Sequence, residues 1–158
     1  IVDAVKVPVI AAGGIADGRG AAAAFMLGAK GIQVGTRFVV TEESQVHEKY
    51  KEAILKAKDI DSKVTGRSTG HPVRGLRNQM TKEYLKREAE GASLEELELL
   101  TAGGLRRAVV EGDVTTGSVM AGQSAAMIRE ELSCREVIDR LMQEMTALLK
   151  QGAGSNIV

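Results

Sequence analysis

The sequence predicts an α/β fold built on parallel strands, and three observations support this prediction. Two short apolar runs, residues 7–12 and 31–35, are continuous rather than alternating, which is typical of strands in a parallel sheet. Each run ends on glycine, at Gly13-Gly14 and at Gly35. An alanine-rich segment of helical length, residues 21–27, lies between them. Strand, helix and strand with tight joints make a βαβ unit, which implies a right-handed crossover.

The signals at the ends of this first helix are local. Asp17 is a candidate N-cap, and Gly28 is a candidate C-terminal stop. The two strands are expected to be buried on both faces, as in a parallel sheet, yet two strands cannot complete such a sheet. We therefore expect the chain to be the C-terminal half of a longer α/β protein.

The pattern then becomes helical. Apolar residues recur at helical spacing within residues 41–58. Residues 61–70 are polar and are expected to form a loop with a short extended piece around Val64, and residues 73–89 return to a helical pattern. Ser93 and Glu96 match a capping box, and residues 105–110 indicate one more short helix. We expect residues 43–111 to form an inserted helical domain.

The closing part, residues 112–158, is expected to contain two helices. Residues 118–126 are small and read as a closely packed helix. Ser133 and Glu136 form a second capping box ahead of a long apolar stripe, and residues 152–158 are expected to fray. Residues 1–42 would then hold the two strands, and 112–158 the closing helices.

Composition and charge give no support to several classes of function. The 158 residues carry 21 basic and 21 acidic side chains, a formal net charge of zero, and only 3% aromatics with no Trp. This balance gives no reason to expect a nucleic-acid or membrane partner. One cysteine excludes an internal disulfide and fits a cytoplasmic protein. No metal site is expected.

The chemistry is expected at the two glycine strand ends. Gly13-Gly14 and Gly35-Thr36 place backbone N–H groups and one hydroxyl at the carboxyl edge of the sheet, where they can surround a phosphate. In TIM barrels, the loops after the last two strands frequently build such a site. The alternative is that these glycines only form tight βα turns.

Specific stretches also resemble a known family. Residues 8–20 (PVIAAGGIADGRG) and 31–38 (GIQVGTRF) closely resemble the FMN-binding half of the nitronate monooxygenase (2-nitropropane dioxygenase) family. Residues 74–79 and 112–123 also resemble this family, so that the resemblance covers nearly the whole chain. Within the family, the chain is most similar to the FMN-dependent enoyl-[acyl-carrier-protein] reductases.

The resemblance implies the C-terminal part of a TIM (β/α)8 barrel with a small helical domain inserted after the last strand. It implies FMN held by residues at the two strand ends: Ala12, Gly13, Gly14, Gln33, Val34, Gly35 and Thr36. NADH or NADPH would be the co-substrate, and a monovalent cation is a further candidate cofactor. The substrate would be an enoyl thioester on acyl carrier protein, and we expect a homodimer. The catalytic histidine of the family precedes the stretch present here, so no residue of this chain is assigned its role.

Five further residues are candidates for substrate or supporting roles. His71, in a loop of the inserted domain, is a candidate for lining the substrate or for acid–base catalysis. Arg74, Arg77 and Asn78 have the spacing of one helix face and are candidates for binding phosphates or an acidic partner, the alternative being a solvated basic face. Gln123 is expected either near the flavin or in helix packing.

Three functions remain open at this point. The first is the FMN-dependent reduction of enoyl thioesters in fatty-acid synthesis, and the second is the flavin-dependent oxidation of alkyl nitronates. The third is a non-catalytic, phosphate-binding half-barrel. Since the first two share the phosphate site, the glycine motifs do not separate them.

Overall fold

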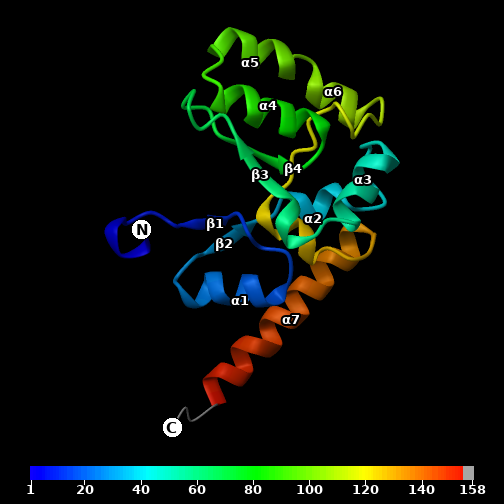
Figure 1. Cartoon of the computed structure of the whole chain (residues 1–158). Coiled ribbons are helices and arrows are strands. Elements are labelled where there is room, and N and C mark those ends of the chain that lie inside the picture. Colours follow the sequence, from blue (N-terminus) through cyan, green and yellow to red (C-terminus); the bar gives the residue numbers. More distant parts are fainter. Residues whose placement is uncertain (155–158) are drawn as a thin grey trace. The chain divides into compact units, whose positions relative to one another are not determined.

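The computed structural model describes residues 1–154 and divides them into two compact units (Figure 1). The first unit combines Ile1–Glu43 with the chain from Glu131 onward, and the second is Ser44–Glu130. The expected boundary of the inserted domain, at residue 111, therefore falls inside the second unit. None of the helices in residues 1–154 is long and apolar enough to cross a membrane.

The predicted βαβ unit is confirmed. Strands β1 (Ile10–Ala12) and β2 (Gly31–Gln33) pair in parallel, and α1 (Gly18–Met26) connects them. The Asp17 side chain caps α1 by accepting hydrogen bonds from the N–H groups of Arg19 and Gly20. Gly28 follows α1 with a φ of 95°, a left-handed conformation that favours glycine and turns the chain toward β2.

The two strands are shorter and more exposed than predicted. Only three residues of each pair, and Ile10 on β1 is 56% exposed. The physical reason is the number of neighbours, because within the described residues β1 and β2 form a two-stranded sheet. A parallel strand is buried on both faces only where further strands and helices cover it.

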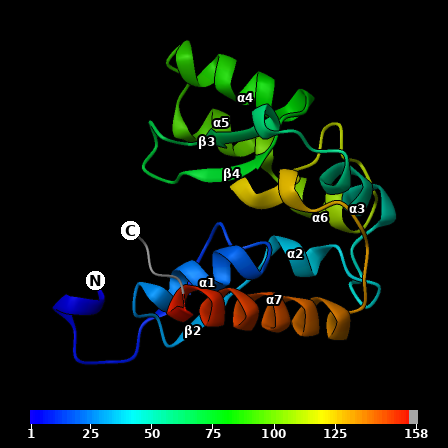
Figure 2. The same cartoon turned by 90° about the horizontal axis from the view of Figure 1, so that it is seen from below.

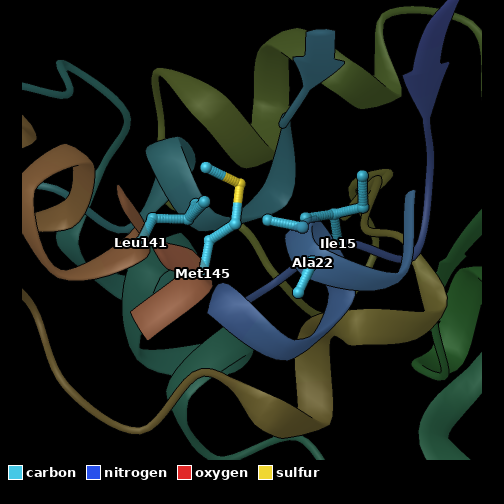
Figure 3. Close-up of a cluster of buried hydrophobic side chains, with 5 residues drawn as sticks. Ile15, Ala22, Leu141 and Met145 are labelled. Carbon is cyan, nitrogen blue, oxygen red and sulfur yellow. The ribbon is translucent and has the colours of Figure 1, made fainter. Parts of the chain in front are cut away.

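The core of the first unit lies between α1 and α7 (Cys134–Gly154), which pack against each other (Figure 2). Ile15 and Ala22 approach Leu141 and Met145 of α7 in a buried cluster (Figure 3). The α-carbon of Gly18 lies so close to α7 that an added Cβ would be 2.2 Å from the Cβ of Glu144. The N–H of Gly18 also donates to Glu144 Oε2 at 2.9 Å.

The capping box that begins α7 is confirmed. The N–H of Ser133 donates to Glu136 Oε2 at 3.0 Å, and the N–H of Glu136 donates to Ser133 Oγ at 3.2 Å. The helix continues to Gly154, so the expectation of fraying from residue 152 is wrong for its first residues, while residues 155–158 lie outside the described part. The first unit also contains η1 (Val2–Ala4) and α2 (Thr36–Val39).

The second unit combines helices with an antiparallel hairpin. Strands β3 (Ser62–Thr65) and β4 (Val73–Leu76) pair antiparallel and lie against α4 (Figure 2). Met80 and Tyr84 of α4 pack against Leu97 of α5. The remaining elements are α3 (Glu48–Leu55), η2 (Asp59–Asp61), α4 (Gln79–Ala89), α5 (Leu94–Thr101), α6 (Gly104–Val109) and η3 (Gln123–Met127).

Two predictions for this unit are wrong. Residues 73–76 form β4 rather than the start of a helix, because they pair with β3 in a hairpin. The expected small-residue helix over 118–126 is a short 3₁₀ helix, Gln123–Met127, preceded by extended chain. The extended part pairs with the hairpin, since Met120 forms a bridge to Gly75 and the N–H of Leu76 donates to the carbonyl of Val119.

The α1–α7 contact predicts a stability difference between two neighbouring glycines. Gly18→Ala inserts a methyl group against α7 and should lower the free energy of unfolding by about 1–3 kcal/mol. Gly20→Ala, on the same helix, meets only Ile15 at 3.4 Å and should be neutral or stabilising. Urea denaturation of both variants measures the difference. Equal stability would contradict the close α1–α7 packing.

Candidate phosphate site at the glycine strand ends

The structure brings the two glycine strand ends together. Ala12 is the register partner of Gln33, so that the last residues of β1 and β2 lie side by side. Parallel strands end at the same edge of a sheet, and Gly13-Gly14 therefore leave the sheet beside the segment that leads to Gly35. This edge is the place where the sequence predicts the phosphate site.

The expected ligand-facing residues are accessible. Ala12, Gly13, Gly14, Gln33 and Gly35 are exposed, whereas Val34 and Thr36 are half-buried. Val34 packs against the α1–α7 core, which fixes the second strand end to the first unit. The structure thus gathers the predicted residues at one edge and leaves that edge open.

Two of the glycines are explained by their backbone, and one is not. Gly13 and Gly14 have φ values of 93° and 74°, a backbone conformation that residues other than glycine rarely adopt. Gly35 has a φ of −105°, which any residue can adopt, and an added Cβ would meet no atom within 4 Å. Neither backbone strain nor a contact within the described residues thus accounts for a glycine at position 35. A bare backbone here fits the close approach of a bound group.

The N-terminus of α1 is already used by a protein carboxylate. The Asp17 carboxylate accepts hydrogen bonds from the N–H groups of Arg19 and Gly20 and from the Arg19 guanidinium, at 2.6–3.3 Å. Partial burial alone would raise the pKa of Asp17, but the hydrogen bonds and charge of Arg19 outweigh it and lower the pKa. The N–H groups of Arg19 and Gly20 are therefore already paired within the protein.

Arg74, Arg77 and Asn78 do not share a helix face, and that prediction is wrong. Arg74 lies on β4 and donates to Ser62 Oγ at 2.9 Å, and Arg77 pairs with Asp61 at 3.0 Å. Asn78 caps α4, and its Nδ2 donates to the carbonyls of Val114 and Gly117 at 2.9 and 2.7 Å. Their helical spacing arises because the strand ends and the next helix begins within five residues. Asn78 is a structural residue.

His71 lines a cavity of about 330 Å3 within the second unit. The wall is formed by the hairpin, α4, α5, α6 and the chain around Val119 and Met120. Tyr50 supports this wall, since its hydroxyl donates to the Met120 carbonyl at 2.7 Å and burial raises its pKa to about 12. Gln123 is exposed at the start of η3 and does not line the cavity.

Sequence reasoning missed this cavity and its walls. The sequence did contain one signal, the glycine pair Gly103-Gly104. In the structure, an added Cβ at Gly104 would be 2.6 Å from Ser118 Oγ, so the glycine permits a close approach between these two segments of the chain. A second hollow, of about 510 Å3, lies near Lys56, Arg77 and Lys82. In residues 1–154, no group of three or more His, Cys, Asp and Glu side chains is placed to hold a metal ion.

Comparison with known proteins identifies relatives. Residues 1–144 match the family model described as nitronate monooxygenase. A probable nitronate monooxygenase from Bacillus subtilis is 36% identical over 90% of this chain and 41% of its own length. A probable nitronate monooxygenase from Staphylococcus aureus is 38% identical over 78% of this chain and 35% of its own length.

Two solved structures extend the comparison. FabK from Thermotoga maritima is 47% identical, with a TM-score of 0.92 over 97% of this chain and 49% of that one. A nitroalkane oxidase from Streptomyces ansochromogenes is 30% identical, with a TM-score of 0.75 over 96% of this chain and 43% of that one. The chain spans about two fifths of the length of the curated relatives that it matches, and about half of FabK.

The role found for Asn78 gives a prediction. Asn78→Ala removes the α4 cap and leaves the carbonyls of Val114 and Gly117 without their donor, which should lower the free energy of unfolding by about 2–4 kcal/mol. Arg77→Gln removes a partly exposed ion pair with Asp61 and should cost less than about 1 kcal/mol. Chemical denaturation compares the two. A stable Asn78→Ala protein with altered ligand binding would contradict the structural role.

Proposed function

The chain belongs to the nitronate monooxygenase family, and from this premise we propose that it binds the phosphate of FMN at the carboxyl ends of β1 and β2. The family consists of flavin-dependent oxidoreductases, and both the family and FabK are FMN enzymes. The proposed contacts are the backbone of Gly13, Gly14 and Gly35 with the Thr36 hydroxyl. Ala12, Gln33 and Val34 would line the same end of the site.

The observation that carries this proposal is the bare backbone at Gly35. Its φ of −105° imposes no need for glycine, and the space beside it is empty of protein atoms to 4 Å. Phosphate oxygens can approach backbone N–H groups closely only where no side chain intervenes. The residues present thus fit a phosphate group, with the Asp17 carboxylate kept apart as the cap of α1.

We further propose that the first unit completes a TIM (β/α)8 barrel and that the second is the insertion after its last strand. The exposed edge of β1 supports this, since Ile10 and Val7 leave apolar surface uncovered. The short length of the chain relative to its relatives supports it as well. In such barrels, the loops after the last two strands frequently bind phosphate.

For the reaction, we propose the reduction of enoyl-[acyl-carrier-protein] thioesters by NADH or NADPH. The similarity to FabK supports this choice, because it combines higher identity and higher TM-score than the similarity to the nitroalkane oxidase. When bound, FMN would supply the transfer of a hydride from the nicotinamide to the double bond of the thioester. The part of this chain would be to hold the phosphate and thereby fix the position of the ring system.

The second candidate is the oxidation of alkyl nitronates. The family description and the names of the curated relatives favour it. Both reactions need the same phosphate site, so the glycine strand ends support them equally. Substrate chemistry, rather than cofactor binding, must separate them.

The phosphate proposal is tested at Gly35. Gly35→Ala should weaken FMN binding at least about tenfold, equivalent to about 1.4 kcal/mol, because the methyl group occupies the space of the phosphate. Gly152→Ala also adds a methyl group in open space, but at the far end of α7, and should leave the affinity unchanged. Quenching of FMN fluorescence measures both. Unchanged FMN binding by Gly35→Ala would place the phosphate elsewhere.

The reaction is tested in two separate mixing experiments. Reduced holoprotein is mixed with a crotonyl thioester in the absence of oxygen, stopped-flow absorbance follows reoxidation of the flavin, and we expect the thioester to reoxidise it. Oxidised holoprotein is mixed with an alkyl nitronate in the presence of oxygen, and oxygen consumption here, without reoxidation of the reduced flavin by the thioester, would favour the second candidate. A protein that stays colourless after mixing with FMN and desalting would support the non-catalytic alternative.

A further inference from the structure

The hollow near Lys56, Arg77 and Lys82 combines a basic rim with an apolar floor. The rim consists of these three exposed cations, which come from the end of α3, from the residue after β4 and from α4. The floor consists of Leu76 and Val119, which also line the hollow and are buried. Its volume of about 510 Å3 is that of a small-molecule site. Such a lining suits a ligand that joins an anionic group to an apolar body.

Lys82 contributes a positive charge that the protein does not pair. In the described part of the chain, residues 1–154, no carboxylate forms an ion pair with its ammonium group. Lys82 lies four residues after Asn78, the N-cap of α4, and the first turn of this helix contains no acidic side chain. The positive end of the helix dipole and the ammonium group therefore add their potentials at the hollow. A bound anion would compensate both.

The carboxylate in the lining, that of Asp61, is already engaged. Its Oδ1 pairs with Arg77 Nη2 at 3.0 Å, and its Oδ2 accepts a hydrogen bond from the N–H of Lys58 at 3.0 Å. This pair uses one nitrogen of a guanidinium that carries five N–H donors. Lys56 pairs with Glu52 at 2.8 Å, and an exposed pair of this kind contributes little to stability. Arg77 and Lys56 can therefore turn toward a ligand without leaving a buried charge.

The amide in the lining leaves recognition to these cations. Asn78 Nδ2 donates to the carbonyls of Val114 and Gly117, and its Oδ1 accepts from the N–H of Thr81 at 2.9 Å. An amide that is occupied in this way offers a ligand little. A phosphate monoester brings up to two negative charges and three acceptor oxygens, so that it can contact several cations at once. A single carboxylate has fewer of both.

We propose that this hollow binds the phosphate monoester of a nucleotide, with the phosphate at the basic rim and the base on the apolar floor. The phosphate site rests on the hollow alone. The identity of the nucleotide rests on the proposed function. In that reaction the phosphate could come from the 2′-phosphate of NADPH or from the 3′-phosphate of coenzyme A, as the carrier of a thioester.

The test titrates the FMN-loaded protein, in which the proposed phosphate site at the glycine strand ends is filled, with three probes. These are adenosine 2′,5′-bisphosphate, adenosine 3′,5′-bisphosphate and adenosine, and isothermal titration calorimetry measures their affinities. We expect adenosine to bind at least about tenfold more weakly than the better bisphosphate, because it lacks the phosphate groups. A preference for the 2′,5′ isomer would identify NADPH as the source, and a preference for the 3′,5′ isomer would identify coenzyme A.

Lys82→Gln should weaken the better bisphosphate at least about fivefold, because it removes a charged donor from the rim. Lys86→Gln is the matched control, since Lys86 is an exposed lysine of the same helix outside the hollow, and it should leave the affinity unchanged. Lys56→Gln tests the opposite side of the lining. Raising the ionic strength from about 0.01 to about 0.15 M should weaken binding, because the screening length falls from about 30 to about 8 Å.

The inference would be overturned by an absence of bisphosphate binding, by equal affinity for adenosine, or by equal losses in Lys82→Gln and Lys86→Gln. The proposed function fails separately, through an absence of FMN binding or of flavin reoxidation by enoyl thioesters. The Gly35→Ala protein without FMN covers that case, because its proposed FMN site is altered and its hollow is not. Bisphosphate binding that depends on Lys82 in this protein would still support the site.

Discussion

The candidate site depends on the parallel pairing of β1 and β2. Because parallel strands end at the same edge of a sheet, this pairing sets Ala12 beside Gln33 and brings the two following glycine segments together. The same geometry requires a crossover helix, which is α1. This helix packs on α7 at close range, and the absence of a side chain at Gly18 permits the approach. One pairing therefore links the core of the first unit to the edge of the proposed phosphate site.

The parts of the fold that the sequence predicts correctly are specified by neighbouring residues. Asp17 and the Ser133–Glu136 pair cap their helices through contacts within three residues, so that the signal is contained in a short stretch. The glycines of the proposed phosphate site belong to the same class, since they directly follow the strands that position them. The position of these glycines at one edge of the sheet could be predicted from the sequence. The empty space beside Gly35 could not, because it depends on where the rest of the folded chain lies.

The parts that were missed depend on distant partners. Val73–Leu76 is a strand because Ser62–Thr65 lies beside it, and Met120 is extended because Gly75 admits the chain at close range. Helical spacing in a short stretch cannot report such pairing. The cavity beside His71 arises from these same long-range contacts, and no local motif indicates it. Its walls come from segments far apart in sequence.

For a member of the nitronate monooxygenase family, the proposed contact between phosphate and the glycines that follow β1 and β2 is the most specific proposal made here. Amide NMR spectra of glycine-labelled protein, titrated in parallel with FMN and with riboflavin, test it most directly. Riboflavin lacks the phosphate but retains the ring system. We expect FMN to shift the amide signals of Gly13, Gly14 and Gly35 and riboflavin to leave them nearly unchanged. Equal shifts with both ligands, or shifts confined to other glycines, would contradict it.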